Sequence, residues 1–231
     1  MLSYQSIAQK VAEGEISIVP YNHLNIGPAS YDLTLGNSFI EVRPEVTNVE
    51  ICTSDSIPPQ FRGVSGGSIP TRKKVRVRSM DESYPEHKIE VSEGKGIVLP
   101  PKGFVLATTE EYIKASPKYA LYVEGRSSVG RMGLQVQNAG FVDPGFEGQI
   151  TLELFNASDV PIVLRPGRRI CQVTIIELDE PTQKPYNGKY MGQTGAVSSR
   201  IEKDREVGED TGAQNEQRGA WRDSPCERGL S

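Results

Sequence analysis

Short apolar stretches, separated by turns rich in glycine and proline, run through most of the sequence. Between Gln149 and Phe155 the apolar residues Ile150, Leu152 and Leu154 alternate with other residues, as expected of a strand with one buried face. Similar stretches predict strands at residues 16–19, 31–36, 97–99, 104–107, 119–123, 161–164 and 170–176. Short strands at this spacing are typical of an all-β sandwich or barrel. The pattern therefore predicts a mainly β fold.

One short helix is expected at the N-terminus. Ser3 or Ser6 can cap it, Ile7 and Val11 share one face, and Gly14 supplies the stop.

Two turns are also predicted from local signals. Gly36-Asn37 is expected to end the strand at 31–36. Arg165-Pro-Gly167 is expected to join the strands at 161–164 and 170–176 into a hairpin.

Two regions lack a regular pattern. Residues 43–95 contain paired prolines, paired glycines and a basic run at 72–78, which we interpret as a solvated edge strand. Residues 205–231 have almost no apolar content and are expected to be a disordered tail, with Trp221 as their one large aromatic side chain. The remaining chain, residues 1–204, is expected to form a single domain in which 181–204 is a C-terminal segment rich in glycine, lysine, tyrosine and glutamine.

Composition narrows the class of protein. The 231 residues, 36% of them hydrophobic, suffice for one globular domain with a core, and a net charge of -4 argues against binding of a nucleic acid polymer. No apolar run reaches about 18 residues, so no membrane span and a cytoplasmic location are expected. Three widely spaced cysteines argue against a disulfide framework, and Cys171 is expected to be a core thiol.

The first candidate for a catalytic residue is Glu153, a carboxylate within the predicted strand at 149–155. It lies on the opposite side from Ile150, Leu152 and Leu154, together with Thr151. Desolvation among apolar neighbours would raise its pKa and suit it to proton transfer near neutral pH. A solvated glutamate on the wet face of a sheet explains the same spacing equally well.

A second candidate is the glycine-punctuated turn at residues 126–131. It carries Arg126, Ser127, Ser128 and Arg131, and guanidinium groups with hydroxyls and glycine-freed amides bind phosphate oxygens well. Taken singly, these arginines are more simply surface residues, but Asp143 and Glu153 follow within 30 residues and favour a site. Asp32 could neighbour that site, although a role in tying down its strand is the favoured interpretation.

Motifs in three separated regions of the chain, residues 26–39, 125–153 and 185–204, carry a resemblance to a known family. GRSSVGRMGL at 125–134 and AGFVDPGFEGQITLE at 139–153 resemble the dCTP deaminases of the dUTPase superfamily. IGPASYDLTLGNSF at 26–39 is similar to their N-terminal strand motif, and PYNGKYMGQTGAVSSRIEKD at 185–204 to their nucleotide-covering segment. The resemblance implies a dUTPase-like distorted β-barrel or jelly-roll that assembles as a homotrimer, with sites at subunit interfaces.

The resemblance also implies roles for single residues. Glu153 would be the general base, and Ser127 and Arg131 would contribute to catalysis within the triphosphate-binding turn. Asp143 would pack against the deoxyribose and position water for hydrolysis of the nucleotide. The substrate-binding set expected from the motifs is Arg126, Ser127, Ser128, Arg131, Asn138, Asp143, Thr151, Leu152, Tyr186, Lys189 and Gln193.

The implied reaction is deamination of dCTP without zinc. The usual zinc-dependent deaminases need a His or Cys with a Cys-x-x-Cys pair, whereas this chain has two histidines and no closely spaced cysteines. Magnesium would arrive with the triphosphate, and no metal ligand is expected in the protein.

Three readings of the function stay open at this point. Residues 136–143 follow a Val-x-Asn-Ala-Gly-x-Val-Asp pattern that looks more like the uracil-reading hairpin of dUTPases. The product could therefore be dUTP or dUMP, and a dUTP diphosphatase without deaminase activity is the alternative enzyme. A nucleotide-sensing β-trimer is the non-enzymatic reading.

Overall fold

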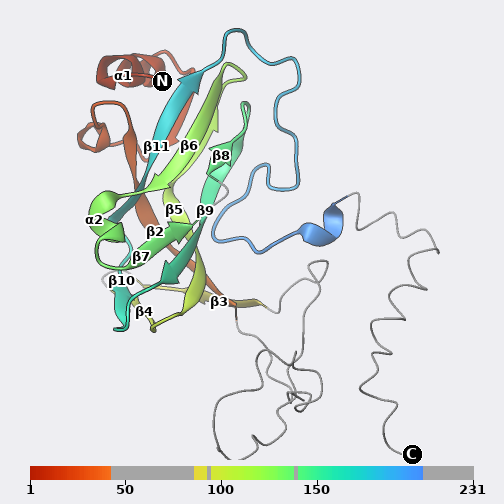
Figure 1. The fold of residues 1–231 in the computed structure, drawn as a ribbon. Helices are drawn as coiled ribbons and strands as arrows, with labels where there is room; N and C mark the ends of the chain where they lie inside the picture. The colour runs from red at the N-terminus through yellow and green to blue at the C-terminus, as the bar shows by residue number, and fades with distance from the viewer. Residues whose placement is uncertain (43–85, 93–94, 138–139, 205–231) are drawn as a thin grey trace, which may run out of the picture. The chain divides into compact units, whose positions relative to one another are not determined.

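The computed structural model describes residues 1–42, 86–92, 95–137 and 140–204 (Figure 1). Residues 1–43 and 86–198 form one compact unit, and the description below concerns that unit. A second unit comprises 44–85 and 199–231, of which only 199–204 are described, with the short 3-10 helix η4 (Ile201–Lys203). The predicted basic edge at 72–78 and the predicted disordered tail at 205–231 lie outside the described residues.

Strands are the main regular secondary structure of the compact unit. Its helices are α1 (Tyr4–Ala12), η1 (His23–Asn25) and α2 (Ser127–Gly130). Its strands are β1 (Ile16–Val19), β2 (Tyr31–Val42), β3 (Glu86–Glu90), β4 (Ile97–Leu99), β5 (Phe104–Ala115), β6 (Tyr119–Gly125), β7 (Leu134–Gln137), β8 (Phe141–Val142), β9 (Glu147–Asn156), β10 (Ile162–Leu164) and β11 (Arg169–Glu177).

Nine of these strands form one antiparallel sheet. Its main path runs β7-β9-β5-β2-β11-β6-β8, while β1 pairs with β5 and β3 pairs with β2. The sheet curls so strongly that β6 and β7 approach each other. A Cβ added at Gly125 on β6 would lie only 3.4 Å from the Cβ of Val136 on β7. The prediction of a mainly β, barrel-like fold with a short N-terminal helix is confirmed (Figure 1).

The N-terminal helix begins and ends where the sequence predicts. The Ser3 hydroxyl accepts a hydrogen bond from the Ser6 amide at 3.5 Å, which identifies Ser3 as the cap. Ile7 is fully buried, and Gly14 follows the helix with φ +76°.

The predicted turn at Gly36-Asn37 is wrong, because β2 continues through it to Val42. Gly36 is needed for a close approach between strands. A Cβ at this position would lie 2.7 Å from Cγ2 of Thr108 and 3.0 Å from the carbonyl oxygen of Thr109. The pairing of β2 with β5 shifts register between Leu35 and Phe39, which is where glycine lets the backbones come together.

The predicted hairpin between 161–164 and 170–176 is also wrong. β10 pairs with β4 in a separate two-stranded sheet, with Val163 opposite Val98. β11 instead lies between β2 and β6 in the large sheet. The turn signal at 165–167 was correct as a local feature, since Gly167 has φ +82°, but it joins two different sheets.

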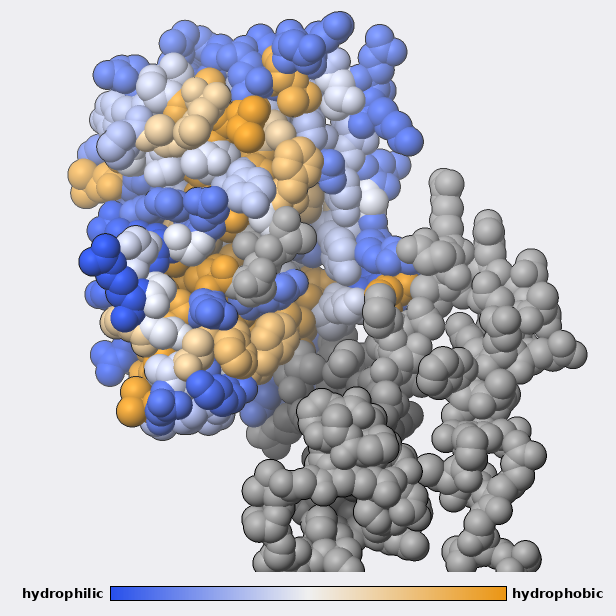
Figure 2. Space-filling view, viewed as in Figure 1, coloured by the Kyte–Doolittle hydropathy of each residue, from blue (hydrophilic) through white to orange (hydrophobic). Residues whose placement is uncertain are grey.

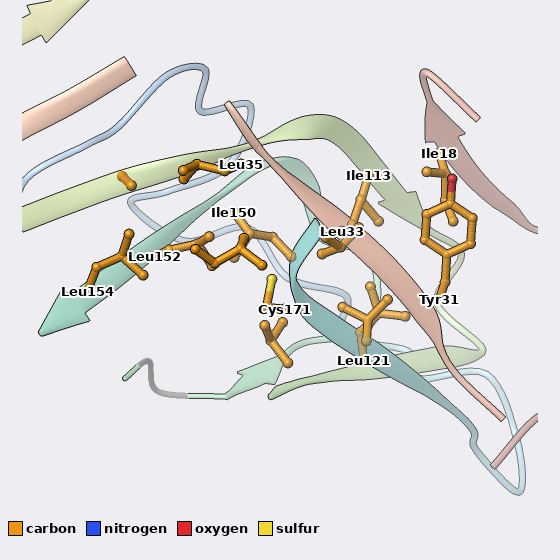
Figure 3. Packing of buried hydrophobic residues seen from close by; sticks show 14 of the residues in the cluster. Ile18, Tyr31, Leu33, Leu35, Ile113, Leu121, Ile150, Leu152, Leu154 and Cys171 are labelled. Carbon is orange, nitrogen blue, oxygen red and sulfur yellow. The ribbon is translucent and has the colours of Figure 1, made fainter. Parts of the chain in front are cut away.

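The core lies on the inner face of the curled sheet (Figure 3). Burial alternates along all ten residues of β9, so Ile150, Leu152 and Leu154 point inward as predicted. Cys171 is fully buried in this core, and burial raises the pKa of its thiol, which confirms the predicted core role. Figure 2 shows a polar face interrupted by apolar patches. Within the described residues, no helix combines the length and apolar character that crossing a membrane would require.

Candidate functional site

Glu153 lies on the less buried face of β9, opposite the core-facing row. Its cross-strand neighbour on β5 is Leu106, and Thr151 and Phe155 flank it on the same face. The side chain is half-buried, and desolvation alone raises the pKa of its carboxyl above the ordinary value. Within the described part of the chain, no hydrogen bond or ion pair satisfies this carboxylate. It is therefore a proton acceptor with an elevated pKa and free lone pairs.

The C-terminal segment covers part of the same face. The Val197 amide donates a hydrogen bond to the Thr151 hydroxyl at 3.2 Å. Gln193 donates from its side-chain amide to the Gln149 carbonyl at 2.7 Å and is half-buried. Leu152, also expected to bind substrate, has a fully buried side chain within the core, so only its backbone is available to a ligand.

The predicted phosphate-binding turn forms the short helix α2. Val129 is its buried anchor, while Ser127, Ser128 and Arg131 are exposed. Because the anchor faces the core, the two hydroxyls and the second guanidinium are left on the surface, where an anion can reach them.

Arg126 is held differently from Arg131. Its Nε lies 3.3 Å from Oδ2 of Asp32, and its Nη1 donates to the Arg169 carbonyl at 3.4 Å. Arg169 also contacts the same Asp32 oxygen at 3.1 Å. Asp32 therefore orients a residue of the candidate site, whereas the favoured interpretation from the sequence gave it only a role in tying down its strand.

Asp143 and Tyr186 lie close together at a second turn. Asp143 is exposed, and its carbonyl accepts a hydrogen bond from the Phe146 amide at 3.1 Å. The Tyr186 amide donates to the Pro144 carbonyl at 2.8 Å, and its ring packs on Phe146 with centroids 5.8 Å apart. The C-terminal segment thus begins directly against the turn that carries Asp143.

The remaining predicted residues are partly placed. The Lys189 ammonium lies 5.4 Å from the ring centroid of Tyr190, close to Tyr186 in the chain. Asn138 lies outside the described residues. In a single chain, no hydrogen bond or ion pair that we describe joins the 126–131 turn to Glu153, and β7 runs between α2 and β9. The structure therefore presents two candidate half-sites: a carboxylate face covered by the C-terminal segment, and the exposed turn at residues 126–131, whose phosphate-binding role stays a prediction.

One residue of this region was missed at the sequence level. Gln149 contacts both β5 and the C-terminal segment through its side chain. The alternation of residues 149–155 places Gln149 on the same face as Glu153, and this position was the sequence feature that could have identified it. In the described ranges, histidine, cysteine, aspartate and glutamate side chains nowhere gather in a group of three or more that could hold a metal ion.

Comparison with known proteins identifies the family. The model of the dCTP deaminase-like family matches residues 1–178. The chain is 40% identical over 206 residues to a protein of Sulfurihydrogenibium sp. (strain YO3AOP1) named dCTP deaminase, dUMP-forming, covering 89% of this chain and 99% of that protein. A protein of the same name from Aquifex aeolicus is 40% identical over 90% of this chain and 98% of its own length.

The fold is shared with a solved structure. It resembles the crystal structure of 2′-deoxycytidine 5′-triphosphate deaminase from Agrobacterium tumefaciens, with a TM-score of 0.50 and 19% identity. The match covers 75% of this chain and 46% of that one, so this chain aligns with less than half of that structure. Together with the family match over most of the chain, these likenesses show that the chain belongs to the dCTP deaminase-like family.

Proposed function

We propose that this protein hydrolyses dCTP to dUTP and ammonia and then releases dUMP and diphosphate. The observation that carries the deaminase step is Glu153, a half-buried carboxyl on β9 whose desolvation raises its pKa. The second step is supported by relatives that are 40% identical to this chain and are named dCTP deaminase, dUMP-forming.

Glu153 can carry each proton that the deamination requires. Water must lose a proton to attack C4 of the cytosine, N3 must gain one, and the amino group must leave as ammonia. A carboxylate with a raised pKa can accept the water proton and deliver it to N3, and then accept the proton of the new C4 hydroxyl and deliver it to the amino group, which leaves as ammonia. Thr151 on the same face and the backbone of Leu152 would orient the base beside this carboxylate.

The triphosphate is assigned to the 126–131 turn and the C-terminal segment. Arg126 and Arg131 supply guanidinium forks, and Ser127 and Ser128 supply hydroxyls. The Asp32 contact to Nε leaves Nη2 of Arg126 available to phosphate oxygens. Tyr186, Lys189 and Gln193 would close over the nucleotide from the other side. Magnesium would enter as part of the nucleotide complex and neutralise some of its charge.

Asp143 is assigned to the hydrolytic step. Its exposed carboxylate can orient the deoxyribose and the water that attacks the α-phosphorus, which releases diphosphate and leaves dUMP. Asn138, which follows β7 in the sequence, is assigned to reading the base edge.

We further propose that the two half-sites meet across the interfaces of a homotrimer formed by residues 1–204 as one domain. Two observations support this assembly. The exposed 126–131 turn has no described contact with Glu153 of its own chain, so a second subunit is needed to complete a site. Large apolar side chains also remain exposed on paired strands, such as Val98 and Val163 on β4 and β10. The cytoplasm is the proposed location, since the substrate is a free nucleotide.

A single product analysis tests this function. Purified protein is incubated with dCTP and magnesium, ammonia is followed, and the nucleotides are separated by chromatography. We expect ammonia, dUMP and diphosphate. Ammonia with dUTP as the end product would remove the hydrolytic step, and diphosphate from dUTP with no turnover of dCTP would identify a dUTP diphosphatase. Intact dCTP and intact dUTP would contradict both enzymatic assignments.

A further inference from the structure

Residues 190–197, which we call the C-terminal strap, lie against β9 and bridge to it at one residue. Gly148 and Gln193 form a parallel bridge. The Gly192 amide donates to the Glu147 carbonyl at 2.7 Å, and the Gln149 amide donates to the Gln193 carbonyl at 2.9 Å. Beyond this bridge the strap has no further backbone ladder to β9, and side chains take over.

Gln149 makes the central side-chain contact to the strap. Its Oε1 accepts a hydrogen bond from the Gly195 amide at 2.6 Å. Its Nε2 donates to the carbonyls of Thr109 at 2.9 Å and Glu110 at 3.1 Å. Both amide donors and the acceptor are therefore used, and one side chain joins β5 to the strap.

The position of Gln149 follows from an irregularity in the sheet. The pairing of β5 with β9 shifts register between Thr108 and Tyr112, so the carbonyls of Thr109 and Glu110 fall out of the regular ladder. Unpaired carbonyls in a partly buried strand carry a desolvation cost. Gln149 donates to both carbonyls, although the Thr108 hydroxyl also donates to the Thr109 carbonyl at 3.2 Å, and the two Gln149 bonds orient its Oε1 toward the strap.

The strap then leads toward Glu153. The next hydrogen bond from the strap to β9 after Gly195 comes from the Val197 amide, which donates to the Thr151 hydroxyl at 3.2 Å. Gln149, Thr151 and Glu153 are successive side chains on one face of β9. The described hydrogen bonds from the strap to side chains of β9 therefore reach Thr151, the neighbour of the candidate base on this face.

We infer that Gln149 is a positioning residue that docks the strap on β9 and thereby forms one wall of the substrate pocket beside Glu153. The functional part of this inference rests on the proposed function, while the docking part rests only on the hydrogen bonds above. Ser38 contributes a weaker anchor, since its hydroxyl accepts a single bond from the Ala196 amide at 3.1 Å.

The test compares Gln149→Met with Gln5→Met in the full chain. Methionine keeps the length of the side chain and removes all three hydrogen bonds, while Gln5 is exposed on α1 and serves as the matched control. Hydrogen exchange of a peptide spanning 190–198 is measured first, with no nucleotide present. We expect the strap to exchange about tenfold faster in Gln149→Met, with β11 unchanged in both variants.

Steady-state kinetics with dCTP then test the effect on the substrate. We expect the KM of Gln149→Met to rise about tenfold and kcat to change less than about threefold, because Glu153 itself is intact. Gln149→Glu keeps an acceptor for Gly195 but loses both donors, so it should fall between wild type and Gln149→Met. It also carries the test if the methionine variant does not fold.

The outcomes separate this inference from the proposed function. Unchanged exchange of the strap in both Gln149 variants would overturn the docking role. Faster exchange with an unchanged KM would show that the strap is no wall of the pocket. A wild-type protein that leaves dCTP intact would remove the proposed function and the pocket role with it, whereas the exchange data would still decide the docking.

Discussion

The face of β9 that carries Glu153 and the turn at residues 126–131 are built in opposite ways. The β9 face is half-buried and crossed by the strap, and Gln149 and Thr151 on it are hydrogen-bonded. The turn is exposed except for the buried anchor Val129 and the Asp32 contact of Arg126. A proton-transfer group with a raised pKa needs a desolvated environment, whereas a turn that is proposed to bind phosphate must stay accessible.

The largest expected effect comes from Glu153→Gln. This change keeps the shape of the side chain and removes the proton acceptor. The kcat for deamination of dCTP should therefore fall about 100-fold to 10,000-fold, the range typical of general acid–base groups. Release of diphosphate from dUTP should survive, because that step is assigned to Asp143. Ammonia and diphosphate are measured separately on the two substrates.

Glu110→Gln is the matched control for Glu153→Gln. Glu110 is an exposed strand glutamate on β5 and should show wild-type rates. Equal loss of both reactions in Glu153→Gln would mean that the β9 face supports substrate binding or folding in general. The proposed difference between a proton-transfer face and a phosphate-binding turn would then be contradicted.

Arg131→Ala should weaken substrate binding, whereas Glu153→Gln should slow the deamination step. Arg131 is exposed and makes no described side-chain hydrogen bond, so the melting temperature should stay within about 2 °C of wild type. Loss of a guanidinium contact to phosphate should raise the KM for dCTP about 10-fold to 100-fold.

Arg168→Ala, which removes an exposed arginine outside the turn, is the control for this change. An unaffected KM in Arg131→Ala would take the turn out of the substrate site. A large drop in melting temperature would show instead that the turn is part of the fold.

Much of the β9 face could be predicted from the sequence because strand burial has a local period of two. The alternation placed Ile150, Leu152 and Leu154 inward and Glu153 on the other face, and burial along β9 follows that pattern. The helix cap at Ser3 was equally local. Features that depend only on neighbours in the chain are accessible to this kind of reasoning.

Features that depend on pairing between distant segments were not accessible. Gly36-Asn37 has the composition of a turn, yet packing against Thr108 and Thr109 makes Gly36 a point of close approach within a strand. The partner of β10 is β4, and no signal within 161–176 specifies that pairing. The Asp32–Arg126 ion pair likewise links residues whose proximity exists only after β11 is placed between β2 and β6.

Gly36→Ala and Gly130→Ala compare the packing around the β9 face with the packing of the 126–131 turn through the stability of the protein. A Cβ at Gly36 would collide with Thr108, which lies opposite Thr151 across the β5–β9 ladder. We expect a loss of about 1–3 kcal/mol in the free energy of unfolding, as for other overpacked sites.

Gly130 ends α2 in the turn, and a Cβ there would meet nothing within 4 Å. Its replacement should be neutral or slightly stabilising, because alanine reduces the freedom of the unfolded chain. Urea denaturation of both variants provides the measurement. Similar losses at both positions would contradict the difference in packing between the two regions.

The smallest expected effect is a change of stability with pH at Glu111, a buried carboxyl on β5. It lies where the pairing of β5 with β9 shifts register, between Thr108 and Tyr112. It is 2% exposed, and its Oε2 accepts a hydrogen bond from the Thr34 amide at 2.8 Å. Desolvation raises the pKa of this carboxyl in the folded protein, as it does for Glu153. The two residues differ in that Glu111 has a backbone partner and Glu153 has none that we describe.

A raised pKa in the folded state sets the sign of the pH dependence. Below the ordinary glutamate pKa of about 4.3, Glu111 is protonated in both states and its contribution to stability is fully present. As the pH rises toward the folded-state pKa, the unfolded chain releases the proton first and that stability is lost. Glu111→Gln keeps an acceptor for Thr34 and never ionises, so it should be more stable than wild type at pH 8. Melting curves from pH 4 to 8 should show this advantage growing with pH, and a constant difference would mean that Glu111 does not titrate in the folded protein over this range.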